Sequence, residues 1–316
     1  MVQRRTPLVW STAFGLVAIG CAACSVLFVS SDKQCATDAD CHARGSEFAS
    51  ARCSARGMCL VVDEFDAGPE TEGGTDASAD PFACGKVAAP RPDPATQVDL
   101  SLRFIDNSAG GPPKDAVTRL CSSSDPQCTS PRVLVGEPSD AGAGFVVPNA
   151  AGIVSAKVEL GFEGYFELQA PGFPPNFRST SPALWRPENH DDHTLARTEE
   201  VDYFADTAVG KPGAFDRAYG LVLVFVRDCN KQPLGAMHVS TTANEPKMKL
   251  FYIINAFPSP TATETDSRGG VAGFVNVPPG IHSFSASFAD TGKVMGSGRM
   301  IVRAGAVTTI AIEPSL

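Results

Sequence analysis

The sequence predicts a mainly β protein in which two consecutive β-sandwiches follow a small disulfide-rich module and a disordered acidic linker. The 316 residues include 29 Gly and 25 Pro but only 2 Trp and 4 Tyr, which suits many short strands joined by turns. Residues 97–104 alternate apolar and polar side chains, and residues 220–226 form a continuous apolar run. With 43% hydrophobic residues, the chain can also bury a sizeable core.

The first segment carries the features of an export signal. Arg4 and Arg5 precede an uncharged run from Leu8 to Val29, and a Cys following small residues resembles a bacterial lipobox. Two cysteines compete for lipidation. We favour Cys24 over Cys21, because cleavage at Cys24 leaves eight later cysteines that can all pair. The alternative is an uncleaved transmembrane anchor, and either arrangement places the remainder outside the cytoplasm.

A cysteine-rich module is expected next, at residues 25–62. Its cysteines are separated by five, eleven and five residues, whereas structural zinc pairs usually leave about two to four. Few large apolar residues accompany them, so disulfides are expected to hold the module together. The four cysteines are Cys35, Cys41, Cys53 and Cys59.

Residues 63–82 are expected to form an extended acidic linker. This stretch has seven Asp or Glu and no Lys or Arg, so it carries most of the net charge of −9. The rest of the chain is nearly neutral. A nucleic-acid partner is therefore not expected, because phosphate binding requires a basic surface.

Two sandwich units are expected in the remainder, at residues 83–190 and 217–316, joined by a short helix and connector at 191–216. Val98, Leu100, Leu102 and Phe104 alternate as in a half-buried strand, and Gly220–Asp228 is typical of a strand covered on both faces. Each strand is followed by an Asp, a polar turn, a Pro and a second alternating strand. This shared order indicates an internal repeat.

The stretch TDSRGGVAGFVNVPPG, at residues 265–280, predicts a strand between two turns. Alternating threonines at 261, 263 and 265 lead into it, and a further strand at 281–288 follows. Gly269 or Gly270 would supply the positive φ of the first turn, and Pro279 with Gly280 suits a type II turn. The glycines are thus interpreted as structural, because their spacing does not match a phosphate-binding loop.

The connector is expected to contain one helix. Thr198 is the predicted N-cap, Glu199 and Glu200 suit the positive end of the helix dipole, and Gly210 is expected to end the helix.

Three segments of the second sandwich unit carry a family resemblance: LVFVRDCNKQPLGAMHV, TETDSRGGVAGFVNVPPG and MIVRAGAVTTIAIEPS. This unit resembles the carboxypeptidase regulatory-like, or transthyretin-like, β-sandwich family. The resemblance covers residues 220–316. The segment GFEGYFELQAPGFPP resembles a related sandwich of secreted myxobacterial proteins, and the cysteine-rich module resembles one found after the lipidated Cys in such proteins. The resemblance implies a non-catalytic accessory domain. His42, His190, His193, His238 and His282 all lack a Glu three residues on, so the zinc motif of the metallocarboxypeptidases is absent.

Further disulfides are expected in the sandwich units. Cys121 and Cys128 could close a local loop, and by elimination Cys84 would pair with Cys229. The last strand, VTTIAIEP, offers no Asn for the Lys–Asn isopeptide crosslink of related adhesin domains.

One cluster could carry metal chemistry. The segment ENHDDHT contains His190, Asp192 and His193, which could hold a divalent metal or act in acid–base catalysis, whereas the less specific interpretation is a solvated surface loop. We expect the surface loop, because His-x-x-His alone is a weak signal. No G-x-S-x-G motif for a serine hydrolase is present.

The favoured function is a non-enzymatic cell-surface lipoprotein with structural or binding modules. It would need no cofactor, attach to the membrane through its N-terminal lipid, and bind an extracellular protein or polysaccharide. A carbohydrate-binding accessory protein is the first alternative, and a metal-dependent hydrolase using His190 and His193 is the second. Sugar binding would require exposed aromatic side chains, for which the candidates are Trp185, Tyr165, Phe166 and Phe173.

Overall fold

The computed structural model describes residues 37–43, 51–53, 59–61, 81–86, 93–180, 183–184 and 188–315. The chain divides into two compact units, Met1–Thr75 and Asp76–Leu316. The expected signal segment, the lipidation site, Cys35 and most of the acidic linker lie outside the described residues.

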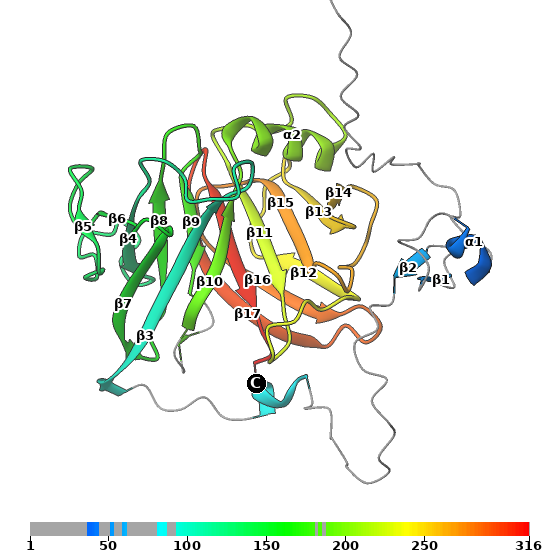
Figure 1. Ribbon diagram of the computed structural model, residues 1–316, viewed down its shortest axis with the longest axis horizontal. Helices are drawn as coiled ribbons and strands as arrows, with labels where there is room; N and C mark the ends of the chain where they lie inside the picture. Colours follow the sequence, from blue (N-terminus) through cyan, green and yellow to red (C-terminus); the bar gives the residue numbers. More distant parts are fainter. Residues whose placement is uncertain are drawn as a thin grey trace, which may run out of the picture. The chain divides into compact units, whose positions relative to one another are not determined.

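The described part of the first unit contains one short helix and one strand pair (Figure 1). Helix α1 is Asp38–His42, and strands β1 (Ala51–Cys53) and β2 (Cys59–Val61) pair antiparallel. The register places the backbones of Cys53 and Cys59 opposite each other.

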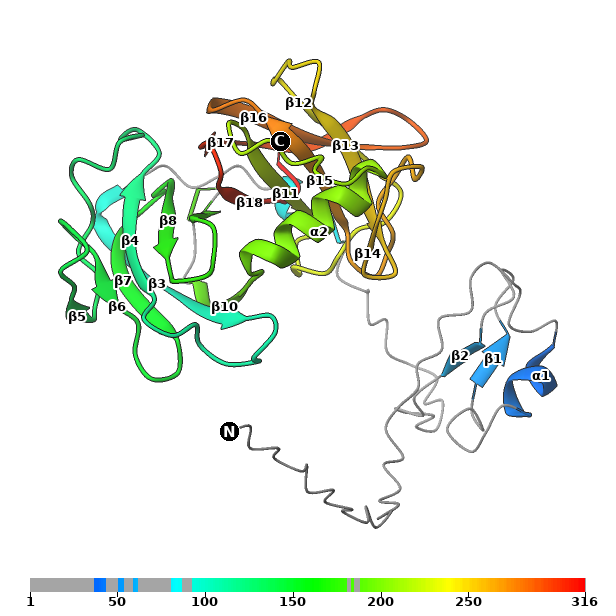
Figure 2. The ribbon, with the colours of Figure 1, turned by 90° about the horizontal axis from the view of Figure 1, so that it is seen from above.

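The second unit is mainly β and contains two sandwiches, as the sequence predicts (Figure 2). In the first sandwich, β3 lies between β7 and β10, and a second sheet contains β4, β8 and β9 with the short strands β5 and β6. These strands are β3 (Asp93–Asp106), β4 (Val117–Ser122), β5 (Glu137–Pro138), β6 (Val146–Val147), β7 (Ile153–Leu160), β8 (Gly164–Gln169), β9 (Asn176–Ser179) and β10 (Glu188–Leu195).

In the second sandwich, β11 is the central strand of one layer, and the other layer has the order β12-β16-β17. The strands are β11 (Gly220–Val226), β12 (Met237–Thr241), β13 (Lys249–Ile254), β14 (Phe257–Ser259), β15 (Val271–Val277), β16 (Gly280–Phe288), β17 (Val294–Val302) and β18 (Val307–Ile312).

The two sandwiches share one topology. In the first, β3 pairs antiparallel with β7 and parallel with β10, while β4, β8 and β9 pair antiparallel in that order. In the second, β11 pairs antiparallel with β15 and parallel with β18, while β12, β16 and β17 follow the same antiparallel order. The repeated order of strand, Asp and turn in the sequence therefore corresponds to a repeated fold.

A single sheet joins the two sandwiches. Strand β9 of the first pairs parallel with β18 of the second, with Asn176 opposite Val307 and Arg178 opposite Thr309, which completes a ten-stranded sheet (Figure 1). Buried side chains of the first sandwich, including Tyr165 and Phe177, belong to the same core cluster as those of the second. The Arg303 guanidinium donates to the carbonyl of Pro126 across this junction, at 2.8 Å.

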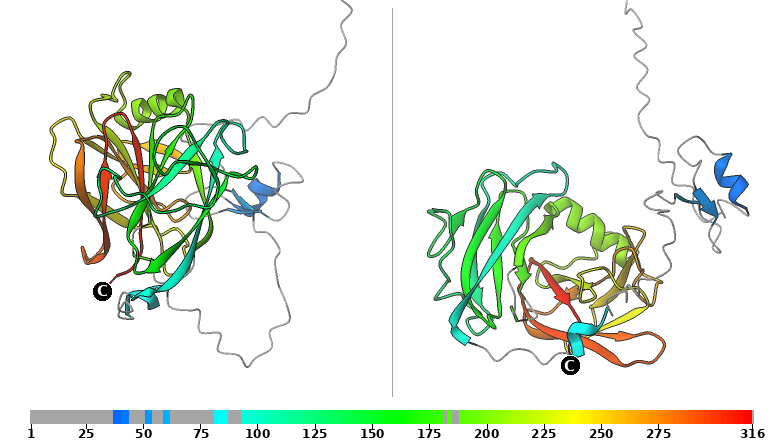
Figure 3. Two further views of the ribbon diagram at one scale, coloured as in Figure 1. Left: turned by 90° about the vertical axis from the view of Figure 1, so that its left-hand side faces the viewer. Right: turned by 60° about the horizontal axis from the view of Figure 1, so that its bottom comes forward.

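The strand patterns of the sequence are confirmed in both sandwiches. Val98, Leu100, Leu102 and Phe104 of β3 are all buried in the first core. Strand β11 is covered on both faces, by the second core on one side and by helix α2, Thr198–Val209, on the other (Figure 3).

The C-terminal end of helix α2 is as predicted, and its N-terminal end differs by one residue. Its N-cap is Arg197 rather than Thr198, and the Glu200 carboxylate accepts the Arg197 backbone N–H at 2.7 Å, as one half of a capping box. At the other end, Gly210 has φ 73° and donates its N–H to the carbonyl of Asp206. Gly210 thus ends the helix in the left-handed conformation that favours glycine.

The segment around TDSRGGVAGFVNVPPG differs from the prediction in its threonines and in its second turn, and confirms the prediction for the first turn. The threonines at 261, 263 and 265 lie outside the strands, and Thr265 instead donates its hydroxyl to the carbonyl of Leu234. Gly270, with φ +60°, takes the positive φ of the first turn. The second turn carries the chain from β15 in one sheet to β16 in the other, and Gly280 has φ +148° rather than the about +80° of a type II turn.

Two disulfides lie in the second unit, and they are the pairings that the sequence suggests. Cys121 joins Cys128 within the first sandwich, with 5.2 Å between the Cα atoms. Cys84 joins Cys229 just after β11, with a Cα separation of 5.5 Å, and so fixes the short 3-10 helix Ala83–Lys86 against the second sandwich. Phe82 packs edge-on against Phe288 beside this disulfide, with ring centroids 5.3 Å apart.

Candidate functional site

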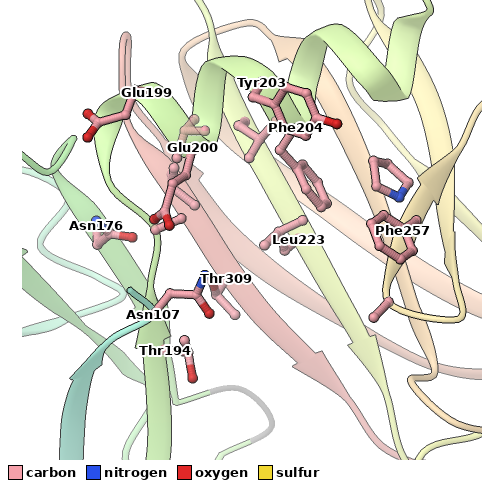
Figure 4. A pocket seen from close by; sticks show the side chains of 16 residues that line it. Asn107, Asn176, Thr194, Glu199, Glu200, Tyr203, Phe204, Leu223, Phe257 and Thr309 are labelled. Atoms are coloured by element: carbon pink, nitrogen blue, oxygen red, sulfur yellow. The ribbon is translucent and has the colours of Figure 1, made fainter. Parts of the chain in front are cut away.

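A groove of about 540 Å³ lies where the two sandwiches meet beneath helix α2 (Figure 4). Its floor is the shared sheet, and its walls are α2 and the β13–β14 turn. The residues that line it are Asn107, Asn176, Thr194, Ala196, Glu199, Glu200, Val201, Tyr203, Phe204, Leu221, Leu223, Ala256, Phe257, Pro258, Val307 and Thr309.

The floor follows from the two-residue period of the strands. Leu221 and Leu223 of β11 point toward the groove, whereas Val222 and Val224 point into the core on the opposite face. Val307 of β18 extends this apolar surface. The continuous apolar run of β11 therefore serves two surfaces, the sandwich core and the groove.

Helix α2 supplies the first wall. Val201 is buried against the sheet, and Phe204 packs edge-on against Phe251 of β13, with ring centroids 5.4 Å apart. Tyr203 lies at the rim with 71% of its surface exposed. The helix thus presents an aromatic side chain to solvent at the opening of the groove.

The β13–β14 turn supplies the second wall. Asn255 and Ala256 connect the paired residues Ile254 and Phe257, and both have positive φ, at 52° and 68°. This geometry corresponds to a type I′ turn. The Asp266 carboxylate accepts the Asn255 N–H at 2.9 Å, and the turn leaves Phe257 48% exposed at the rim.

The charge of the groove is negative. Among its described lining residues, Glu199 and Glu200 are the charged ones, and none is Lys, Arg or His. Glu200 accepts hydrogen bonds from the Ser108 hydroxyl at 2.9 Å and from the Arg197 backbone. Glu199 is exposed and makes no hydrogen bond or ion pair with the described residues.

An ion pair lies next to the groove and connects helix α2 to the first sandwich. Arg197 donates to the buried carboxylate of Asp106 at 2.7 Å. This hydrogen bond, with backbone N–H donors from Ser108 and Ala109, holds the pKa of the Asp106 carboxyl below its ordinary value.

The expected surface loop ENHDDHT, the candidate metal cluster, is instead strand β10, because it pairs in parallel with β3. Asp192 forms an ion pair with Arg103, whose Nε lies 2.7 Å from Oδ1 of Asp192. His193 is buried and packs against Phe104. Neighbouring strand residues point to opposite faces, so Asp192 and His193 are not brought together. The His190 side chain lies outside the described part of the structure.

No metal-binding group of three or more His, Cys, Asp or Glu occurs in the parts of the chain that the structure describes. No helix among these residues is long and apolar enough to cross a membrane.

The aromatic candidates of the sequence do not form an exposed surface. Tyr165 and Phe166 are buried in the cores, and Phe173 lies beneath the Arg197 guanidinium. Trp185 lies outside the described residues. The exposed aromatic side chains at the groove are Tyr203 and Phe257, which sequence reasoning missed because neither belongs to an alternating pattern.

No protein-family model matches the sequence, and no curated protein matches it. Several solved structures are similar in part. The chain is 11% identical to the Bacillus anthracis TIE protein, with a TM-score of 0.21, and the match covers 70% of this chain and 34% of that protein. It therefore spans about a third of that protein's length.

The streptococcal ancillary pilin is 9% identical, with a TM-score of 0.21, and the match covers 70% of this chain and 69% of the pilin. A family 26 carbohydrate-binding module from Eubacterium rectale Amy13K, solved with maltoheptaose, is 8% identical, with a TM-score of 0.23 and coverages of 68% and 93%. Similarities at this level assign no function to the chain.

Proposed function

We propose that this chain is an exported, non-enzymatic lipoprotein whose two joined sandwiches display the groove to an extracellular ligand. The observation that carries the proposal is the construction of the groove. Its floor runs across the β9–β18 junction, with Asn176 from one sandwich and Val307 from the other. Ligand pockets commonly form at such domain junctions.

The N-terminal sequence supports export and tethering. Arg4 and Arg5 before an apolar run, followed by Cys24 after small residues, fit a secretory signal with a lipidated cysteine. The acidic linker would then hold the sandwiches away from the membrane. The resemblance to carboxypeptidase regulatory-like domains, which are non-catalytic accessories, also favours a binding role.

Metabolic labelling with an alkyne analogue of palmitate tests the tether. We expect label in the wild-type protein and in Cys21→Ser, and none in Cys24→Ser, with wild type in the membrane fraction. Loss of label in Cys21→Ser alone would move the lipid to Cys21. An unlabelled wild-type protein would contradict the lipoprotein proposal.

Carbohydrate binding is a second candidate, and the exposure of Tyr203 and Phe257 at one groove favours it, because aromatic rings offer flat apolar surfaces that sugar rings can cover. Co-sedimentation with insoluble polysaccharides tests it. Binding should fall in Tyr203→Ala and Phe257→Ala and persist in Ile281→Ala, an exposed residue of β16 outside this groove.

A further inference from the structure

We infer that the groove binds a peptide segment of an exported protein in which an aromatic or branched apolar side chain lies next to an Arg or Lys. The inference rests on the proposed function, in that it takes the groove as the ligand site. It adds the chemical class of the ligand.

The apolar side chain of the ligand follows from the floor and walls. Phe204 and Leu223 are only partly buried within an otherwise apolar cluster, and Phe257 is 48% exposed. A ligand that covers these side chains removes apolar surface from water, which is the main favourable term in such association. The volume of about 540 Å³ is enough for one large side chain and the adjoining main chain.

The cationic neighbour follows from the charge of the rim. Glu199 is exposed and makes no hydrogen bond or ion pair with the described residues, although it lies within electrostatic range of Arg197. Glu200 already accepts hydrogen bonds from Ser108 and Arg197. No cationic side chain occurs among the described lining residues, and Arg197 beside the groove is already paired with Asp106. A phosphate, a uronic acid or an acidic peptide would therefore face the like charges of Glu199 and Glu200. A guanidinium or ammonium group would instead gain an opposite charge at Glu199.

The polar inventory of the groove favours a peptide over a polysaccharide. A sugar chain presents many hydroxyls, each of which needs a partner when it leaves water. The Asn176 amide nitrogen already donates to the carbonyl of Pro174 at 2.7 Å, and Thr309 is buried. Asn107, Thr194, Glu199 and Tyr203 remain as exposed polar side chains at the groove, which are few partners for the hydroxyls of a sugar chain. This set suits a ligand with one charged and one apolar group.

Methyl NMR on the full chain tests the inference, because Leu221, Leu223 and Val307 carry methyl groups at the floor. The probe is N-acetyl-Phe-Arg-amide. N-acetyl-Phe-Glu-amide reverses the charge, N-acetyl-Gly-Arg-amide removes the apolar group, and maltohexaose represents a neutral sugar chain. We expect saturable shifts of the groove methyls with the first probe and weaker or absent shifts with the other three.

Three variants sharpen the test. Glu199→Gln should weaken binding of the Phe-Arg probe by about two- to fivefold, the range for an exposed ion pair, and reduce its advantage over the Phe-Glu probe. Glu264→Gln, another exposed carboxylate, is the matched control and should bind as wild type. Thr194→Trp should fill the opening and abolish the shifts.

Equal binding of the Phe-Arg and Phe-Glu probes, or absence of any shift with Phe-Arg, would overturn the inference. Shifts with maltohexaose but not with the dipeptides would also overturn it and would support the carbohydrate candidate. Lipid labelling is a separate readout, so a failure of this inference is distinguishable from a failure of the tether.

Discussion

Asp106 and Asp228 close the same turn in the two sandwiches. Asp106 is the last residue of β3 and Asp228 lies two residues after β11, and each is buried and accepts backbone N–H groups through its Oδ1 atom. The donors to Asp106 are Ser108 and Ala109 at 2.9 and 3.3 Å, and those to Asp228 are Asn230 and Gln232, both at 2.8 Å. The repeat of the fold thus includes the side chain that shapes its first turn.

The first prediction concerns this turn. Asp228→Ala removes an acceptor and leaves two backbone donors without it, so we expect the free energy of unfolding to fall by about 1–3 kcal/mol. Urea denaturation measures the change. Asp290→Ala, at an exposed position in the β16–β17 turn, is the control and should alter stability by less than about 0.5 kcal/mol. Equal stability of both variants would show that the Asp228 turn does not depend on its carboxylate.

The second prediction concerns the type I′ turn beside the groove. Ala256 has φ 68°, a conformation that favours glycine, and its side chain is exposed. Ala256→Gly is therefore expected to raise the free energy of unfolding by about 0.4–1 kcal/mol, as measured by urea denaturation. Ala141→Gly, at an exposed position whose φ is not positive, should give no gain. A lower free energy of unfolding in Ala256→Gly would contradict the interpretation that the positive φ of Ala256 strains the backbone.

The third prediction concerns the pH dependence of the Arg197–Asp106 pair. Because Arg197 lowers the pKa of Asp106 in the folded protein, the pair contributes stability at pH values above the unfolded carboxyl pKa of about 4. That contribution is lost as the pH falls through the lower pKa of the folded state. Arg197→Met should therefore be less stable than wild type at pH 7, with the difference shrinking toward pH 2.

Thermal unfolding across this pH range checks the third prediction. Lys157→Met is the control, because its partner Asp99 and Lys157 itself are 62% and 71% exposed, and such pairs contribute little. A stability difference for Arg197→Met that stays constant from pH 7 to pH 2 would rule out the ion pair as its source.

The fold was predictable where local patterns decide it. The alternation of Val98 through Phe104 and the apolar run of β11 identify strands because burial acts on each strand separately. The β9–β18 junction was not predictable, because neither strand's sequence specifies a partner more than a hundred residues away. The groove was missed for the same reason: Leu223 reads as core, and only its position under α2 shows that it also faces the groove.

The two-residue alternation of side chains along β10 separates the residues of the candidate metal cluster. The grouping of histidines and carboxylates in ENHDDHT predicts either a metal cluster or a solvated surface loop. Its place on β10 puts Asp192 on the solvent side with Arg103 and His193 on the core side with Phe104. The local sequence does not distinguish a buried core histidine such as His193 from a histidine that binds a metal ion.

The last prediction concerns cooperativity between the sandwiches. Leu100 lies in the first core, away from the junction, and Leu100→Ala is expected to cost about 2–5 kcal/mol. If the shared sheet couples the sandwiches, amide exchange should accelerate by similar factors in β3 and in β11, because both open in one unfolding event. Phe284→Ala, in the second core, should likewise accelerate amide exchange by similar factors in β3 and β11. Faster exchange confined to the mutated sandwich would show instead that β9 and β18 separate before either core opens.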